Sequence, residues 1–285
     1  MLRKALVLML VPLAPLAPMA VHAEVVTVRA AVVSDFTRAL RIDEMLEVIR
    51  AEGLANGDDL AAEMFAGAAG ADWSAAVAQV YDAGRMRQRF DQSMAGLPDQ
   101  DAAALADSLV FYTSDLGQKI IGLELEARRA MLDPAVEEAA QARWREMGQG
   151  AGDQGRLDLL DRFVTVNDLI EMNVAGALNA NLTYYRALSG AGAFGDAMPE
   201  AQMLSEVWAQ EADLRKETVD WLFPYLNLAY GSLTPDEMQA YIAFSDTAAG
   251  RKANAVIFAA FDAVFVAAST ELGRAVGLRL NGQDI

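Results

Sequence analysis

Cysteine is absent from the 285-residue chain, and histidine occurs once, at His22. The lack of cysteine excludes disulfides, thiolate metal sites and cysteine nucleophiles. If the first 23 residues are removed, histidine is absent too, which excludes serine-histidine triads and the usual zinc and copper ligand sets. Carboxylate, lysine, tyrosine and hard-cation chemistry remain, but no pattern marks a site. We therefore assign no catalytic residue, no metal and no cofactor.

Basic residues are scarce, since 23 Lys and Arg face 40 Asp and Glu and the formal net charge is −17. This balance predicts that neither nucleic acid nor an anionic membrane surface is a partner. An acidic surface could attract basic partners or loosely held divalent cations, whereas the simpler interpretation is solubility. Charge alone identifies no partner.

Long apolar runs are few, and the first one lies at the N-terminus. Arg3 and Lys4 precede an apolar run at 5–11, and residues 21–23 (VHA) form a small-x-small cleavage pattern. A membrane anchor is disfavoured because the run is shorter than the ~20 residues of a spanning helix. Residues 1–23 therefore predict a secretory signal peptide. Its removal takes two basic and no acidic residues, so the net charge becomes −19.

The second apolar run, residues 253–268, carries Asp262 near its centre. Because it is short of a full span and contains an acid, we expect a helix buried in a bundle and no membrane span.

Alternating strand patterns are also missing, whereas apolar residues recur at helical spacing throughout the chain. The sequence predicts an all-α protein. Expected helices include a short one from Asp43 to Gly53, a long one over 72–97 and another over 157–185. Asp133 before a proline and the capping box at 234–237 (TPDE) mark two further helix starts.

One short motif occurs twice in the chain, as FYTSDLGQK at 111–119 and FSDTAAGRK at 244–252. The phenylalanines, glycines and lysines of the two copies are each 133 residues apart, which predicts one unit used twice. The repeated positions are Phe111, Ser114, Gly117, Lys119, Phe244, Thr247, Gly250 and Lys252. Each copy is expected at a corner between two helices, with Ser114 and Thr247 capping the second helix.

Four glycines within residues 148–155 (GQGAGDQG) predict a linker. The expected organisation is a signal peptide (1–23), a first helical unit (24–147), this linker and a second helical unit (156–285). The two units would be tandem, bundle-type repeats. How they pack together is not predicted.

The repeated motif is interpreted as a packing joint. A glycine in a helix costs ~1 kcal/mol relative to alanine, so two glycines after two corners indicate close approach of another helix. Phe111 and Phe244 are expected to fill the core under each corner, and Lys119 and Lys252 to point to water.

Two acid-base pairs at helical spacing, Glu124 with Arg128 and Glu211 with Arg215, are expected to meet on one helix face. Such pairs usually stabilise a helix. An acid pair for glycan hydrolysis needs two carboxylates about 5 to 10 Å apart around a cleft, which spacing along one helix does not establish.

The two corners, the TPDE opening and the signal sequence resemble the exported bacterial family known as domain of unknown function 2059, here with two copies of the motif. The resemblance covers about residues 99–131 and 234–265. It implies a helical protein of the Gram-negative periplasm and supplies no activity or catalytic set.

The favoured function is therefore an exported interaction or binding module for a protein or envelope component, and we do not assign it as an enzyme. An envelope enzyme acting through carboxylates, such as a glycan hydrolase, would instead show two facing acids in a cleft. A soluble small-ligand-binding protein would show an apolar pocket with a few convergent polar groups.

Overall fold

The computed structural model describes the backbone of residues 18–65, 70–151, 153–195 and 198–282, and side chains in these ranges from Arg29 onward, Ala151 excepted. The predicted signal peptide falls largely on residues 1–17, outside the described residues. The described chain is helical and contains no strand, which confirms the all-α prediction. Its elements are α1 (Pro18–Ala39), α2 (Ile42–Met64), α3 (Gly70–Val80), α4 (Ala83–Ala95), α5 (Asp99–Tyr112), α6 (Asp115–Ala130), α7 (Pro134–Glu146), η1 (Met147–Ala151), α8 (Gln154–Val166), α9 (Leu169–Gly190), α10 (Glu200–Trp208), α11 (Glu211–Ala229), η2 (Tyr230–Ser232), α12 (Pro235–Ser245) and α13 (Ala248–Leu280).

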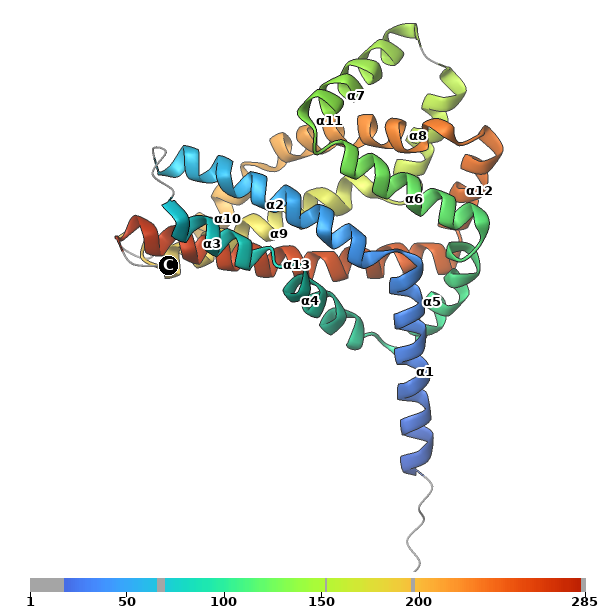
Figure 1. Cartoon of the computed structure of the whole chain (residues 1–285), viewed down its shortest axis with the longest axis horizontal. Helices are drawn as coiled ribbons and strands as arrows, with labels where there is room; N and C mark the ends of the chain where they lie inside the picture. Colours follow the sequence, from blue (N-terminus) through green and yellow to red (C-terminus); the bar gives the residue numbers. More distant parts are fainter. Residues whose placement is uncertain (1–17, 66–69, 152, 196–197, 283–285) are drawn as a thin grey trace, which may run out of the picture.

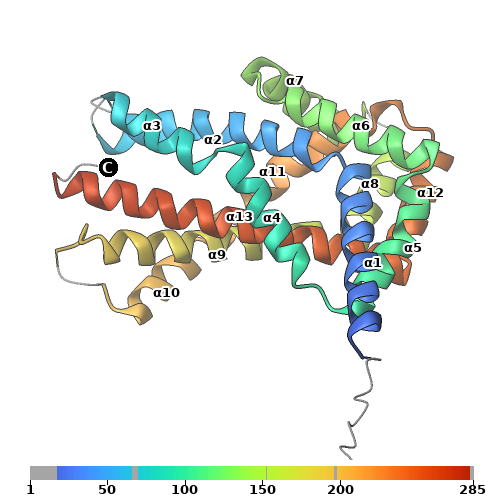
Figure 2. The ribbon, with the colours of Figure 1, turned by 60° about the horizontal axis from the view of Figure 1, so that its bottom comes forward.

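Helix α13 is the axis of the molecule, and its 33 residues span about 50 Å at 1.5 Å per residue. It packs along α9 and also contacts α3, α4 and α5. Figure 1 shows α13 crossing the molecule, and Figure 2 shows it between α2 and α3 on one side and α9 on the other. The C-terminal helix thereby organises helices from both predicted units.

Three clusters of buried apolar side chains form the core, and each combines residues from before and after the glycine-rich segment at 148–155. The first joins α1, α2, α4 and α5 to α13. The second joins α6 to α8, α11 and α12. The third joins α2 and α3 to α9 and α13. The two predicted units therefore share their cores, which answers how they pack.

Helix α2 corrects the expectation of a helix ending before Gly53. The helix continues through Gly53 and Gly57 to Met64, and both glycines lie at close contacts with the next segment. A Cβ at Gly53 would lie 2.3 Å from the ring of Tyr81, and one at Gly57 would lie 2.4 Å from Val77. The missing side chains let α3 and the residue after it approach the α2 backbone.

Two long helices predicted from periodicity are each divided in the structure. Residues 72–97 form α3 and α4, because the side chain of Asp82 accepts a hydrogen bond from Arg85 N at 2.9 Å and caps a new helix. Residues 157–185 belong to α8 and α9, which are separated at Asp168 with φ 52°. Apolar periodicity continues across both breaks and therefore does not reveal them.

The predicted helix starts are confirmed at their caps. Asp133 immediately precedes Pro134, the first residue of α7, and its side chain accepts a hydrogen bond from Ala135 N. Thr234 and Glu237 form the reciprocal capping box, with Thr234 N donating to Glu237 Oε2 and Glu237 N donating to Thr234 Oγ1. These local signals survive in the fold because both partners lie within one helical turn.

Residues 253–268 were expected to be buried, but only one side of α13 is buried in the structure. Within the described residues, α13 is the helix that is long and apolar enough to cross a membrane by length and composition, with a mean hydropathy of 1.8. Only 22% of its most apolar window is buried. The buried side chains, which include Ala253, Val256, Ala260, Val264 and Ala268, form one stripe. Asp262 accepts hydrogen bonds from Asn179 of α9.

Candidate functional site

The two copies of the repeated motif form helix corners with the same local geometry. Ser114 caps α6 and Thr247 caps α13, each accepting from the glycine N three residues later, at 3.1 and 3.0 Å. A Cβ at Gly117 would lie 2.1 Å from the carbonyl oxygen of Phe111, and one at Gly250 would lie 2.2 Å from that of Phe244. The close backbone belongs to the preceding helix of the same corner. The predicted corners and caps are thus confirmed, whereas duplication of the whole unit stays a prediction.

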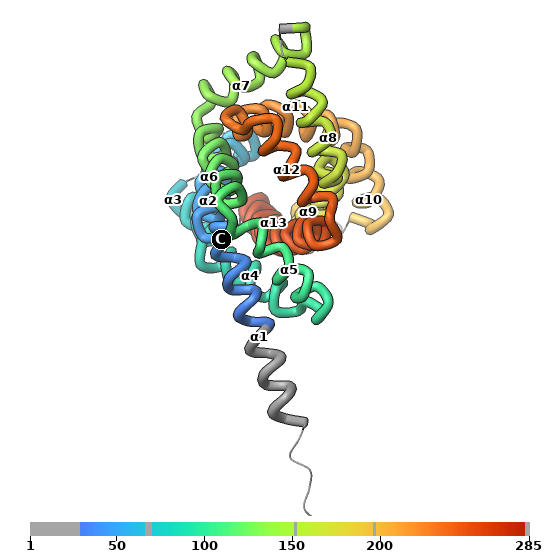
Figure 3. Tube along the Cα trace, turned by 90° about the vertical axis from the view of Figure 1, so that its right-hand side faces the viewer, coloured from blue at the N-terminus to red at the C-terminus, as the bar shows by residue number. Residues whose placement is uncertain are grey.

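The two corners meet through their phenylalanines. The rings of Phe111 and Phe244 stack with centroids 4.0 Å apart and planes 5° apart. Figure 3 looks at the end of the molecule where α5 and α6 lie near α12 and the start of α13. Both rings are partly buried and contact the first and second core clusters. They join two cores, whereas we expected each ring to fill a core under its own corner.

The two lysines of the motif are 40% and 41% exposed, and each also makes an ion contact that was not predicted. Lys119 Nζ donates to both carboxylate oxygens of Glu237 at 2.7 and 2.8 Å. Lys252 Nζ lies 3.0 Å from Asp101 Oδ1, an ion contact without hydrogen-bond geometry. Each lysine therefore reaches the first turn of the other corner's entering helix, α12 or α5. The hydrogen bonds from Lys119 and from the Thr234 backbone lower the pKa of Glu237.

A buried cluster around Glu124 was not predicted. Glu124 Oε1 accepts hydrogen bonds from the hydroxyls of Tyr230, at 2.6 Å, and Tyr241, at 3.1 Å. The Tyr225 hydroxyl donates to the backbone oxygen of Glu124 at 3.1 Å. Burial raises the pKa of Glu124, and the two tyrosine hydrogen bonds oppose that shift. No short sequence pattern links these residues, because Glu124 and the tyrosines are about a hundred positions apart.

Arg128 does not pair with Glu124 as its spacing suggested. It binds Glu52 of α2 in a bidentate pair, with Nε to Oε1 at 2.8 Å and Nη2 to Oε2 at 2.9 Å. The guanidinium also lies 5.9 Å from the ring centroid of Trp221. The other predicted pair is confirmed, since Arg215 Nε donates to Glu211 at 2.9 Å. Arg215 additionally pairs with Glu171 on α9.

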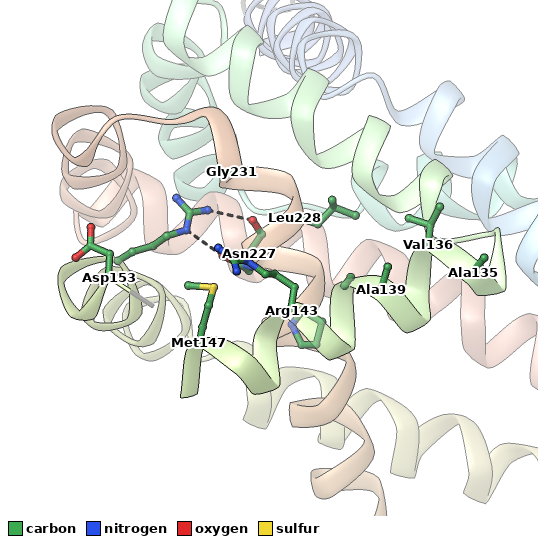
Figure 4. A pocket seen from close by; sticks show the side chains of 12 residues that line it. Ala135, Val136, Ala139, Arg143, Met147, Asp153, Asn227, Leu228 and Gly231 are labelled. Carbon is green, nitrogen blue, oxygen red and sulfur yellow. Dashed lines mark hydrogen bonds between the residues drawn. The ribbon is translucent and has the colours of Figure 1, made fainter. Parts of the chain in front are cut away.

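A groove lies between α7 and α11 and is called here the α7/α11 groove. It encloses about 720 Å³, within the range of small-molecule sites. Figure 4 shows Val136 and Ala139 of α7 opposite Leu228 of α11, with Asp153 and Asn227 toward the other end. Its lining is Ala135, Val136, Ala139, Ala140, Arg143, Met147, Asp153, Arg156, Pro224, Asn227, Leu228 and Gly231. One end is thus aliphatic, and the other combines the polar Asp153 and Asn227 with Met147.

Two arginines supply positive charge to the polar end of the groove. Arg156 is held by Asn227 of α11, through Nε to Oδ1 at 2.9 Å and Nη2 to the backbone oxygen at 3.0 Å. Burial lowers the pKa of Arg156, and Asp153 opposes that shift. Arg143 is 60% exposed and has a loose ion pair with Glu146 at 3.6 Å. The one acid in the lining, Asp153, accepts from Gly155 N as the cap of α8.

A second pocket of about 460 Å³ adjoins the groove and shares Asp153 and Arg156 with it. It runs between α8 and the start of α12 and includes Tyr230 and Thr234 in its lining. Glu52 and Glu124 line neither pocket. The described residues contain no group of three or more acidic side chains that could hold a metal ion. The groove lining thus combines apolar side chains with two arginines and one aspartate.

Comparison with known proteins identifies one similar segment. The profile of a family described as "Uncharacterized protein conserved in bacteria (DUF2059)" matches residues 100–146. The match covers the first corner and α7, which forms one wall of the groove, whereas the second motif copy lies outside it. No curated protein and no solved structure matches the chain. Residues 100–146 are therefore similar to an uncharacterised bacterial family.

Proposed function

We propose that the protein is an exported, periplasmic binding module for an envelope component, and that the α7/α11 groove is its binding site. The observation that carries the proposal is the groove itself, about 720 Å³ with one aliphatic end and one polar end. Small-molecule sites are typically lined by apolar side chains with a few polar groups that orient the ligand.

Export is supported by the composition of residues 1–23. In α1, the side chains placed in or against the core are Val32, Val33, Phe36 and Ala39. All of them follow Glu24, so cleavage after Ala23 leaves these core contacts in place. Intact mass spectrometry of periplasmic protein tests the proposal. A mature N-terminus at Glu24 supports it, and a full-length mass in the membrane fraction contradicts it.

The carboxylate enzyme is less well supported by the geometry. Glu124 has a raised pKa, as a general acid requires. Its Oε1 is, however, held by two tyrosines, and the nearby Glu52 is occupied by Arg128. A substrate needs access to both acids, and neither of them lines a described pocket. We therefore favour binding at the groove over catalysis at Glu124.

Groove binding is tested with Nile red, a neutral apolar dye. Ala139 is an exposed groove residue, so Ala139→Trp should fill the groove and strongly reduce dye binding. Ala201→Trp, at an exposed position on α10, is the matched control and should bind as the wild type does. Equal dye binding by both variants would show that the groove is not the site.

A further inference from the structure

The α7/α11 groove combines apolar contact and charge in a way that selects among ligands. Its aliphatic end is formed by Ala135, Val136, Ala139 and Leu228, and Arg143 lies toward the other end. Arg156 belongs to that other end because it hydrogen-bonds Asn227. A ligand that satisfies both ends has an apolar tail and a polar headgroup. A purely apolar ligand would displace water from Arg143, which is 60% exposed, without replacing its hydrogen bonds, and a purely polar one would leave the aliphatic wall exposed.

The charge of the lining is opposite in sign to that of the molecule. Two arginines and one aspartate give the groove a net charge of +1, whereas the chain as a whole has −17. Asp153 is also committed to the N-terminus of α8. Arg143 retains donors because its partner Glu146 is 3.6 Å away. A monovalent anion therefore matches the groove, whereas the net negative charge of the chain as a whole repels anions.

Arg156 is held in place before any ligand arrives. Its two hydrogen bonds to Asn227 fix the guanidinium between α8 and α11, so little side-chain freedom is lost on binding. Nη1 takes no part in these bonds. A carboxylate can accept from this nitrogen and from Arg143, which lies on the facing helix α7.

We infer that the ligand of the groove is a single-chain amphiphile with a monovalent carboxylate headgroup, bound with its tail along α7 and its headgroup between Arg143 and Arg156. This inference rests on the proposed function, because it names the ligand class of the same site. The carboxylate is favoured over a phosphate monoester because the latter carries about −1.5 to −2 at neutral pH, more than the +1 of the lining.

The experiment compares four probes that share one tail: dodecanoate, dodecyl phosphate, dodecanol and dodecylammonium. Each competes with Nile red on the full chain, below its micelle-forming concentration. Dodecanoate should bind about tenfold more tightly than dodecanol, which corresponds to roughly 1.4 kcal/mol, and dodecylammonium should bind most weakly. Tighter binding of dodecyl phosphate than of dodecanoate would overturn the carboxylate assignment.

Arginine variants provide the matched control. Arg143→Gln should weaken dodecanoate binding about fivefold, as expected for loss of one partly screened charge contact, and should leave dodecanol binding unchanged. Arg145→Gln, which makes the same charge change on the same helix at an exposed position outside the lining, should change dodecanoate binding less than about twofold. Equal losses in both variants would overturn the inference.

The outcomes separate this inference from the proposed function. If dodecanoate and dodecanol bind equally, and Ala139→Trp abolishes both, groove binding stands and the anionic headgroup is wrong. If Ala139→Trp changes neither the probes nor Nile red, the groove is not a binding site and both proposals fail.

Discussion

Glycine at the two corners is required by contact with backbone. The nearest atom to a Cβ at either position is a carbonyl oxygen of the preceding helix, and both distances are close to 2 Å. A flexible side chain could move aside, but this oxygen is fixed by the corner itself. The cost of glycine in a helix is therefore offset by the sharp turn that it permits.

The substitution Gly250→Ala should lower the free energy of unfolding by about 1 to 3 kcal/mol, because the added methyl group overpacks against the Phe244 carbonyl. Gly122→Ala is the matched control in α6, where the nearest atom to the new Cβ is 3.9 Å away, at Arg41 Nη1. It should stabilise by about 0.5 to 1 kcal/mol through reduced chain entropy. Urea denaturation compares them, and equal effects would refute the backbone clash.

Substitution of Lys252 should cost more stability than substitution of an ordinary surface lysine. Lys252→Ala removes the partner of Asp101, whose side chain is only 13% exposed. The expected loss is about 0.5 to 1 kcal/mol, decreasing at high salt because the contact is electrostatic. Lys216→Ala, which removes a fully local pair with Asp220 on the same helix, should leave the denaturation midpoint nearly unchanged. A destabilisation of Lys252→Ala relative to the wild type that is the same at low and high salt would contradict the ion-pair account.

At the level of elements, Glu124 ties α6 to three neighbours at once. Tyr225 lies in α11, Tyr230 in η2 and Tyr241 in α12, and all three hydroxyls donate to Glu124. Burial also raises the pKa values of Tyr230 and Tyr241 well above the ordinary tyrosine value, so both remain protonated donors. The cluster supplies hydrogen bonds inside an otherwise apolar core.

The raised pKa of Glu124 predicts a pH dependence of stability. A carboxyl whose pKa is higher in the folded state stabilises most below its unfolded pKa, and that contribution is lost as pH rises through the folded pKa. Glu124→Gln cannot ionise, but its amide oxygen can still accept from the tyrosines. Its stability relative to the wild type should therefore increase with pH above about 4.3, the unfolded value.

Chemical denaturation at several pH values between 4 and 8 measures this difference. Groups with a lowered pKa, such as Glu171 and Glu237, stabilise the fold less as pH falls. Their contribution cancels in the comparison because the wild type and the variant both contain them. Glu126→Gln, at an exposed glutamate of the same helix, is the control and should keep the wild-type pH profile. A pH-independent difference for Glu124→Gln would show that the carboxylate is not destabilised by burial.

The elements also show how far the two predicted units agree. Both corners join their helices through two residues, 113–114 and 246–247. The helices that follow differ, since α6 has 16 residues and α13 has 33. In the first unit Asp133 and Pro134 start a new helix, whereas α13 continues through the equivalent positions 266 and 267. The corner geometry supports the predicted repeat, which stays a prediction for the rest of each unit.

At the scale of the whole molecule, the shared cores predict cooperative unfolding. Leu46 belongs to the first cluster and Leu160 to the second, and both are at most 1% exposed. Leu46→Ala and Leu160→Ala should each destabilise by about 2 to 5 kcal/mol. Both should shift one common transition, because Phe111 and Phe244 connect the clusters.

Circular dichroism and tryptophan emission, recorded in the same urea titration, test this expectation. Coincident curves indicate a single cooperative unit. Two transitions, with Leu46→Ala shifting one and Leu160→Ala the other, would show that the clusters unfold separately.

Local features were predictable from the chain alone because both partners of each contact lie within a few residues. The all-α class follows from apolar spacing, and the caps at Ser114, Thr247, Asp133 and Thr234 follow from side chains that bind their own helix. The two glycine corners belong to the same group, because the clash that requires glycine is with the preceding turn. Helix lengths were less predictable, since periodicity continued across the breaks at Asp82 and Asp168.

The candidate groove and the polar cluster depend instead on contacts between distant segments. Arg156 meets Asn227, Glu124 meets Tyr230, and Lys119 meets Glu237 across separations of about 70 to 120 residues. Residue spacing contains no information about such pairs, because they arise only when helices far apart in the sequence pack together, as α8 does with α11 and α6 with η2. Composition removed cysteine and, beyond residue 22, histidine from the available chemistry, and packing of the helices decided which of the remaining groups meet, as Arg156 does with Asn227 and Glu124 with Tyr230 and Tyr241.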